Sequence, residues 1–229
     1  MLIGGFQKFS LIDYPGKICA IVFTQGCNFR CPYCYNPELV DPQKFTPSFP
    51  EKDVFSFLKK RKGQLDAVEI TGGEPTLQKD LLAFLEKIKA MGFLVKLDSN
   101  GSSPDIIQEI VQRGAVDYLA MDIKAPLERY QEITRSQVNP NDIQRTIKII
   151  MNSDLDYEFR TTIVKSQLSP KDLLKIAQLI KGAKTYVLQK FVPSKTLDPS
   201  FKKETSYSDE ELKVIKKRIK PYVGQCLIR

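Results

Sequence analysis

The stretch VDYLAMDIK, residues 116–124, decides how this chain builds a parallel β-sheet. Successive side chains of a strand point to opposite faces of the sheet. Leu119 and Met121 would share one apolar face, whereas Asp122 and Lys124 would share the other, at the carboxyl end of the strand. Helices cover both faces of a doubly wound sheet with apolar contacts, so a polar strand face favours the interior of a barrel.

The same polar face recurs on other strand-like runs. Lys96, Asp98 and Asn100 align on residues 93–100, Glu158, Arg160 and Thr162 align on residues 157–164, and Gln189 lies near the end of residues 184–192. For a single strand, a buried ion pair such as that of Asp122 with Lys124 is the alternative interpretation. Burying the charges of four strands without partners would cost several kcal/mol per charge. The recurrence therefore predicts a barrel that encloses a polar ligand, with its site at the carboxyl ends of the strands.

Strand-like and helical segments alternate along the chain. The strand-like runs are residues 19–26, 66–73, 93–100, 116–124, 157–164 and 184–192, and the helical segments are residues 49–61, 77–92, 103–114, 139–152, 169–182 and 208–219. Six such units without low-complexity linkers predict an α/β fold, a partial (β/α)6 TIM-like barrel. We expect a single domain over residues 1–229, with its barrel at about 17–195 and a last helix at about 207–220.

The composition excludes several classes of protein. The 229 residues are 42% hydrophobic, yet no run approaches the ~20 apolar residues of a membrane span. The amino-terminal residues lack the pattern of a secretion signal, so we expect a folded, cytoplasmic protein. The net charge of +8 comes from scattered lysines. Without a basic strip interleaved with aromatic residues, a nucleic-acid partner is disfavoured.

The chemistry centres on the segment CNFRCPYCYN, residues 27–36. Its CPYC alone is typical of a thiol–disulfide oxidoreductase, but Cys27 has no place in that interpretation. The chain contains no histidine, so a zinc site would need Cys19, Cys226 or a carboxylate as its fourth ligand. Three cysteines spaced Cys-x3-Cys-x2-Cys suit a [4Fe-4S] cluster. Three ligands would leave one iron free to bind a substrate or cofactor.

This spacing, with an aromatic residue before the last cysteine and a position just after the first predicted strand, resembles the radical S-adenosylmethionine (SAM) superfamily. The resemblance covers almost the whole chain. It implies that Cys27, Cys31 and Cys34 bind three irons of a [4Fe-4S] cluster and that the amino and carboxylate groups of SAM chelate the fourth. It also implies that Tyr33 packs near the adenine.

Further motifs lie where this superfamily binds SAM. TGGEP, residues 71–75, follows a predicted strand. The matching family segment binds the SAM amino group, so the resemblance implies that SAM is also bound here by Gly72, Gly73, Glu74 and Pro75. DSNG at 98–101 and MDIK at 121–124 resemble the DTNG and DLK segments of glycyl-radical-enzyme activases. The resemblance implies that five residues bind the methionyl and ribose portions of SAM: Asp98, Ser99, Asn100, Asp122 and Lys124. Arg160 is a candidate for binding a carboxylate, because its guanidinium group suits bidentate pairing. Gln189 is another candidate for binding the cofactor.

Within the superfamily the chain resembles the activating proteins of anaerobic ribonucleoside-triphosphate reductase, and next the pyruvate formate-lyase activases. Residues 4–39, TGGEP and the two strand-end motifs carry this resemblance. It implies reductive cleavage of SAM at the cluster, driven by an external reductant such as flavodoxin or ferredoxin. The product would be a glycyl radical on a partner enzyme, whose polypeptide loop would enter through the lateral opening of the barrel.

Two positions depart from this pattern. Many relatives have histidine directly after the third cysteine, where this chain has Tyr35, and some activases have histidine where this chain offers Gln189. These departures concern the choice of partner and the binding of the SAM ribose, and they leave the cluster ligands untouched. Two alternative functions are kept beside the activase. One is a small-molecule enzyme of the same superfamily, similar to 7-carboxy-7-deazaguanine synthase, and the other is a zinc or dithiol redox module.

Overall fold

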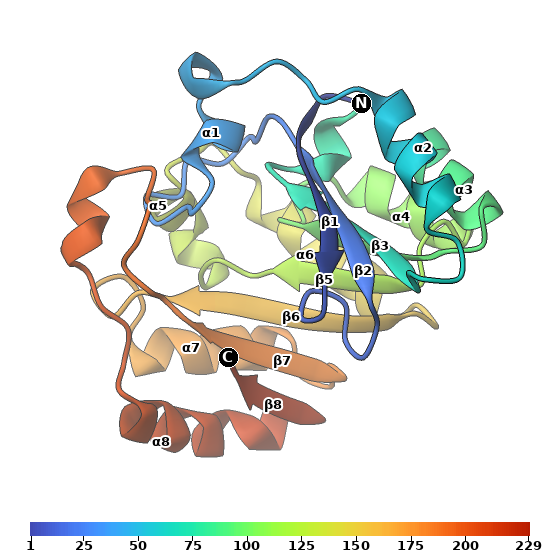
Figure 1. The fold of residues 1–229 in the computed structure, drawn as a ribbon. Coiled ribbons are helices and arrows are strands. Elements are labelled where there is room, and N and C mark those ends of the chain that lie inside the picture. The colour runs from blue at the N-terminus through green and yellow to red at the C-terminus, as the bar shows by residue number, and fades with distance from the viewer.

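Eight strands form one open sheet in the computed structural model, which describes residues 1–229 (Figure 1). The strands are β1 (Ile3–Ser10), β2 (Cys19–Thr24), β3 (Ala67–Gly72), β4 (Leu94–Ser99), β5 (Tyr118–Asp122), β6 (Asp156–Ile163), β7 (Thr185–Lys190) and β8 (Gln225–Ile228). They follow one another in chain order across the sheet. All neighbours are parallel except β1, which runs antiparallel to β2. The sheet is not closed, because β1 and β8 do not pair.

Helices cover the outer side of this sheet. They are α1 (Pro37–Val40), α2 (Glu51–Lys60), α3 (Leu81–Ala90), α4 (Pro104–Gln112), α5 (Tyr130–Thr134), α6 (Pro140–Met151), α7 (Pro170–Leu179) and α8 (Asp209–Ile219). The apolar side chains of α2 to α8 share one core cluster with strand residues such as Val95, Leu97 and Leu119, whereas Val40 of α1 lines a cavity. The residues that alternate with these on the strands, such as Lys96 and Asp98, face the inside of the barrel and line a cavity.

The predicted partial barrel is confirmed, and its six parallel strands are β2 to β7. Leu119 and Met121 are fully buried in the outer core, as the alternation in residues 116–124 predicts, and Asp122 and Lys124 line the cavity. The count of six strands is wrong, because β1 and β8 extend the sheet at its two edges. β1 contains two glycines and three successive exposed side chains, and β8 has only four residues, so neither shows the alternation of a strand.

Two predicted helix starts are reinforced by reciprocal hydrogen bonds. Ser169 and Asp172 form a capping box at the start of α7, and Ser208 and Glu211 form another at the start of α8. Each box satisfies backbone N–H groups that have no partner within the helix. None of the helices is long and apolar enough to cross a lipid bilayer.

Candidate functional site

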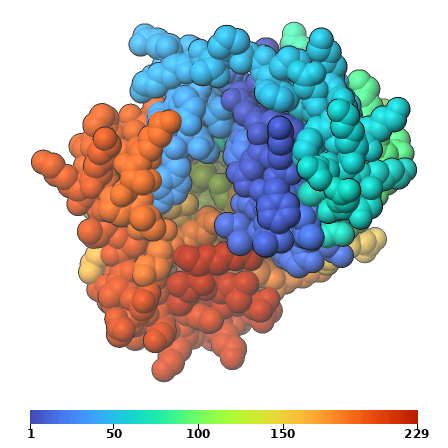
Figure 2. Space-filling view, viewed as in Figure 1, coloured from blue at the N-terminus to red at the C-terminus, as the bar shows by residue number.

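A cavity of about 510 Å³ opens between the amino-terminal and carboxyl-terminal parts of the barrel, seen as the hollow at the centre of Figure 2. It is lined by all but one of the residues predicted for the site: Cys27, Cys31, Tyr33, Cys34, Gly72, Gly73, Glu74, Asp98, Ser99, Asn100, Asp122, Lys124, Arg160 and Gln189. Pro75 is buried behind them, at the start of the short 3-10 helix Pro75–Leu77. Residues from five strands thus meet at one site.

The cysteine loop, residues 27–36, connects β2 to α1 and is fixed against α5. The Phe29 ring meets the Tyr130 ring edge-on at 6.2 Å, and the Arg30 backbone N–H donates to the Thr134 carbonyl oxygen at 2.9 Å. The loop thereby places all three of its thiols on the cavity. Cys19 and Cys226 are buried elsewhere and do not line it.

The state of these thiols separates the three interpretations of the loop. Burial raises the pKa of Cys27 to about 12 and that of Cys31 to about 11, whereas a dithiol redox site needs a lowered pKa. No three Cys, Asp or Glu side chains converge as the ligands of a single metal ion would. In a [4Fe-4S] cluster each thiolate binds a different iron. Three separate thiols on one cavity fit that group.

A chain of alternating acidic and basic side chains crosses the cavity, made up of Glu69, Lys96, Asp98, Arg160, Asp122 and Lys124. Lys96 Nζ donates to Glu69 Oε1 at 2.5 Å and to Asp98 Oδ1 at 2.7 Å. Arg160 Nη2 lies 2.9 Å from Asp98 Oδ2, and its Nε donates to Asp122 Oδ1 at 2.8 Å. Lys124 Nζ donates to Asp122 Oδ2 at 2.9 Å. The polar strand faces therefore line a cavity and also pair with one another, so the premise that these charges lack partners is wrong.

The charges of this chain are set by burial and by their neighbours. Burial alone would raise the pKa of Asp122, but the adjacent Arg160 and Lys124 outweigh it and hold that pKa well below its usual range. Asp98 keeps a lowered pKa in the same way, beside Arg160 and Lys96. Glu69 differs, because burial and the nearby Asp98 charge raise its pKa to about 9. Its Oε2 atom is buried without a hydrogen-bond partner. Burial and the neighbouring charges thus favour the proton on Glu69 rather than on Asp98.

We expect Glu69→Gln to flatten the pH dependence of stability. Between pH 4.5 and about 9 the Glu69 side chain is protonated when folded and ionised when unfolded. Unfolding then releases a proton, so the free energy of unfolding of the native chain falls as pH rises through this window. One such group changes it by at most about 1.4 kcal/mol per pH unit. Thermal unfolding at about pH 6 and about pH 8.5 measures the difference.

The exposed Glu210 provides the control for this experiment, since it forms no ion pair and lies on α8. Glu210→Gln should keep the pH dependence of the native chain. The assignment of the proton to Glu69 would be contradicted if Glu69→Gln also kept it.

Glu74 locks the turn after β3 onto the end of β4. Its Oε1 accepts from the Thr76 backbone N–H at 3.1 Å and from the hydroxyls of Thr76 and Ser99 at 2.5 and 2.8 Å. Its Oε2 accepts only from the Asn100 backbone N–H, at 2.7 Å. A carboxylate oxygen can accept about two hydrogen bonds. One acceptor position on Oε2 thus remains for a ligand.

The two positions that depart from the family pattern are both at the cavity. The Tyr35 ring stacks on the Phe191 ring at 5.7 Å, and its hydroxyl oxygen accepts from the Val192 backbone N–H at 3.0 Å. Tyr35 therefore ties the cysteine loop to the segment after β7. Gln189 is half-buried on β7 and makes no side-chain hydrogen bond within the chain.

Some cavity residues escaped sequence reasoning. Glu69 lies in an apolar run but alternates with Thr71, so its position on the polar face could have been found from the period of two. Arg229 reaches the cavity from the end of β8 and makes a bidentate pair with Glu158, at 2.8 and 2.9 Å. No pattern signalled it, because β8 itself was not predicted. Ile12 lies on the loop between β1 and β2, which also gave no signal.

Comparisons with known proteins agree with this geometry. Residues 21–184 match the model of the radical SAM superfamily. The whole chain is 34% identical to MJ1227 of Methanocaldococcus jannaschii, over 95% of that protein, whose name assigns it provisionally to the glycyl-radical enzyme activating enzymes. The chain is 26% identical to 7-carboxy-7-deazaguanine synthase of Thermococcus kodakarensis and 31% identical to pyruvate formate-lyase-activating enzyme of Listeria monocytogenes. Each of these two alignments covers 76% of the chain and 74% of the relative.

A solved structure shows the same fold at low identity. Streptococcus suis SuiB bound to precursor peptide SuiA superposes with a TM-score of 0.69 at 14% identity, over 90% of this chain. The chain spans only 47% of SuiB, so the likeness concerns the barrel.

Fold and site together define an α/β-barrel enzyme with a cysteine-lined cavity. The chain belongs to the radical SAM superfamily. Membership implies a [4Fe-4S] cluster and SAM as its cofactors.

Proposed function

We propose that this chain is a glycyl-radical-enzyme activating enzyme and that its partner is anaerobic ribonucleoside-triphosphate reductase. Cys27, Cys31 and Cys34 would hold the cluster, and the other predicted residues of the cavity would hold SAM. When bound, these cofactors supply one-electron cleavage and hydrogen-atom abstraction. The full-length similarity to MJ1227 supports the activating role, and the resemblance carried by residues 4–39 supports the choice of partner.

The side chains of the cavity would bind SAM and orient it. Arg160 uses its Nε and Nη2 donors on Asp122 and Asp98, which leaves Nη1 for the SAM carboxylate. The free acceptor position on Glu74 Oε2 suits the SAM amino group. Because Asp98 and Arg160 are largely buried, little water competes for these contacts. The protein thus contributes placement and exclusion of water.

One observation favours a polypeptide over a small molecule as the substrate. Ile12 lines the cavity and is 86% exposed, and Phe9 and Leu11 beside it are 55% and 62% exposed. Contiguous exposed apolar side chains mark surfaces that contact another protein. A polar small molecule that enters the cavity would have no use for such a rim. The rim, residues 9–12, therefore supports docking of a partner enzyme.

We expect Ile12→Glu to lower the yield of glycyl radical while leaving the formation of 5′-deoxyadenosine almost unchanged. A carboxylate at the rim would weaken apolar docking of the partner. A loss of about 1.4 kcal/mol in binding free energy lowers the affinity about tenfold. The yield of glycyl radical on the partner should fall accordingly. Formation of 5′-deoxyadenosine without a partner should stay near that of the native chain, because Ile12 contacts neither cluster ligand nor SAM-binding residue in the proposal.

Val214 is the control for Ile12, being 53% exposed on α8, away from the cavity. Val214→Glu should leave both products unchanged. Equal radical yields from Ile12→Glu and the native chain would argue against a protein substrate at the rim. Turnover of the substrate of 7-carboxy-7-deazaguanine synthase, with no radical on the reductase, would replace the proposed function by the small-molecule alternative.

A further inference from the structure

The outer side of the cysteine loop is covered by residues 192–204, which connect β7 to α8. The Leu197 backbone N–H donates to the Cys34 carbonyl oxygen at 3.0 Å, and the Asp198 N–H donates to that of Pro32 at 2.9 Å. Figure 1 shows this segment in orange beside α1 and α5. A molecule resting on it would be separated from a predicted cluster ligand by a single layer of chain. This segment is therefore a short route for an electron into the site.

This segment and the cysteine loop that it contacts carry positive charge without an ion pair. Arg30, Lys202 and Lys203 are exposed and form no ion pair. Two further cations of the same surface, Arg135 and Lys195, pair with acids but remain half-exposed or more. We call these five residues the basic face. Against these five cations stand Glu38 and Asp198, which pair with Lys195 and Arg135, and Glu204, which forms no ion pair, so positive charge is in excess here.

Arg135, one residue of the basic face, is held in place by specific contacts. It is the only non-glycine residue with a positive φ, at 48°, a conformation that costs of order 1–3 kcal/mol. Its guanidinium donates to Asp198 at 2.7 Å and lies 5.8 Å from the centre of the Phe201 ring. These contacts join α5 to the segment that covers the cysteine loop. This residue thus ties α5 to the segment that bears Lys202 and Lys203.

We propose that the basic face docks an acidic protein that carries single electrons. In the transfer the carrier would be oxidised by one electron and the [4Fe-4S] cluster that the three cysteines would hold would be reduced by that electron, with no bond formed or broken and no proton transferred. Opposite charges steer such encounters and speed them. This inference rests on the proposed function, which needs an external reductant. A nucleic acid fits the face less well, because Phe201, which lies under the Arg135 guanidinium, is buried and offers no stacking surface.

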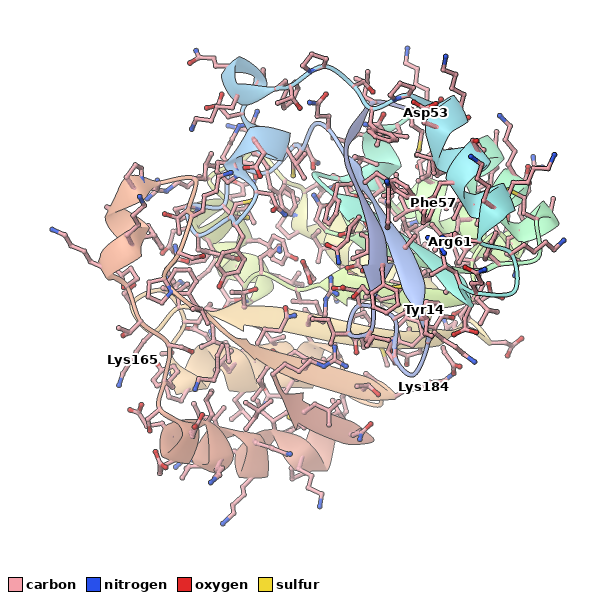
Figure 3. All side chains as sticks on the ribbon, in the orientation of Figure 1. Tyr14, Asp53, Phe57, Arg61, Lys165 and Lys184 are labelled. Carbon is pink, nitrogen blue, oxygen red and sulfur yellow. The ribbon has the colours of Figure 1, made fainter.

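The test compares two double variants of the reconstituted protein with equal changes in charge. Lys202→Glu/Lys203→Glu reverses the basic face, and Lys59→Glu/Lys60→Glu reverses two exposed lysines at the end of α2. In the sequence, that second pair lies between Phe57 and Arg61. Figure 3 labels these two residues at the right of the view, on the opposite side from the segment 192–204. Lys59 and Lys60 lie in the last turn of α2, and Lys202 and Lys203 lie in the last turn of the 3-10 helix Pro199–Lys203.

Two measurements use an acidic flavodoxin as the probe: its dissociation constant for each protein, and the rate at which each protein oxidises its reduced form. We expect the basic-face variant to bind at least about tenfold more weakly, a loss near 1.4 kcal/mol, and to oxidise the probe more slowly. The α2 variant should stay within about threefold of the native chain, a change well under that amount. Native binding should weaken with added salt.

Several results would overturn the inference. They are equal losses in both variants, no loss in the basic-face variant, and displacement of the flavodoxin by a single-stranded oligonucleotide that binds the same lysines. Dithionite needs no docking, so 5′-deoxyadenosine formation with dithionite should be the same in all three proteins. Failure of the proposed function would instead show as a missing glycyl radical with dithionite, whichever variant is used.

Discussion

A Cys31→Ala variant is expected to lose SAM cleavage completely. Cys31 is buried on the cavity, and in the proposed site its thiolate is the one ligand of its iron. No other cysteine lines the cavity besides Cys27 and Cys34, so no replacement ligand is at hand. We expect the reconstituted variant to hold little iron and to form no measurable 5′-deoxyadenosine, a drop of at least about a thousandfold, or about 4 kcal/mol.

Cys226→Ala is the matched control, since Cys226 is also buried but lies on β8 outside the cavity. Its loss should cost about 1 kcal/mol of stability from the small void and leave the iron content intact. Iron and sulfide analysis together with product assay measures both variants. Cleavage at the native rate by Cys31→Ala would remove Cys31 from the ligand set.

Gly73→Ala is expected to damage both stability and activity. A Cβ atom at Gly73 would lie 2.1 Å from the Gly26 carbonyl oxygen and 3.1 Å from that of Leu39. Gly26 cannot yield easily, because its N–H donates to Leu39 and its carbonyl oxygen accepts from Glu74, each at 2.8 Å. The clash would push the start of the cysteine loop away from the turn after β3. We expect the free energy of unfolding to fall by about 3 kcal/mol and the rate of SAM cleavage to fall by about a hundredfold or more.

Gly5→Ala controls for the added methyl group, because the Cβ there would meet only the Phe23 side chain, at an ordinary 3.5 Å. Thermal unfolding and 5′-deoxyadenosine assays would compare the two variants. A Gly73→Ala protein as stable and active as Gly5→Ala would show that the close packing of the two loops is not needed.

The polar strand faces that line the cavity could be predicted from sequence because they depend on the alternation of side chains along a strand. A strand that places Leu119 and Met121 in the outer core must turn Asp122 inward, whatever its neighbours are. The pairing of the charges could not be predicted in this way. Asp122 meets Arg160 because β5 and β6 pair in that register, and register is set by packing of the whole sheet. The same holds for the proton on Glu69, which depends on burial beside Asp98.

The cysteine loop needed only local sequence, whereas its surroundings needed the fold. Its three cysteines are close in the chain, so their spacing suffices to place them together. Residues 192–204 approach Cys34 from more than 150 positions away, through backbone hydrogen bonds that leave no sequence pattern. The basic face and the apolar rim are therefore features that only the structure reveals.

The central claim is that this barrel makes a glycyl radical on a partner protein. The most direct measurement is electron paramagnetic resonance of an anaerobic ribonucleoside-triphosphate reductase after incubation with SAM and the reconstituted, dithionite-reduced protein. The account predicts a glycyl radical on the reductase, with 5′-deoxyadenosine formed in a comparable amount. Deoxyadenosine without the radical would contradict the proposed partner, and a fully loaded protein that forms neither product would contradict the assignment of the cysteine loop.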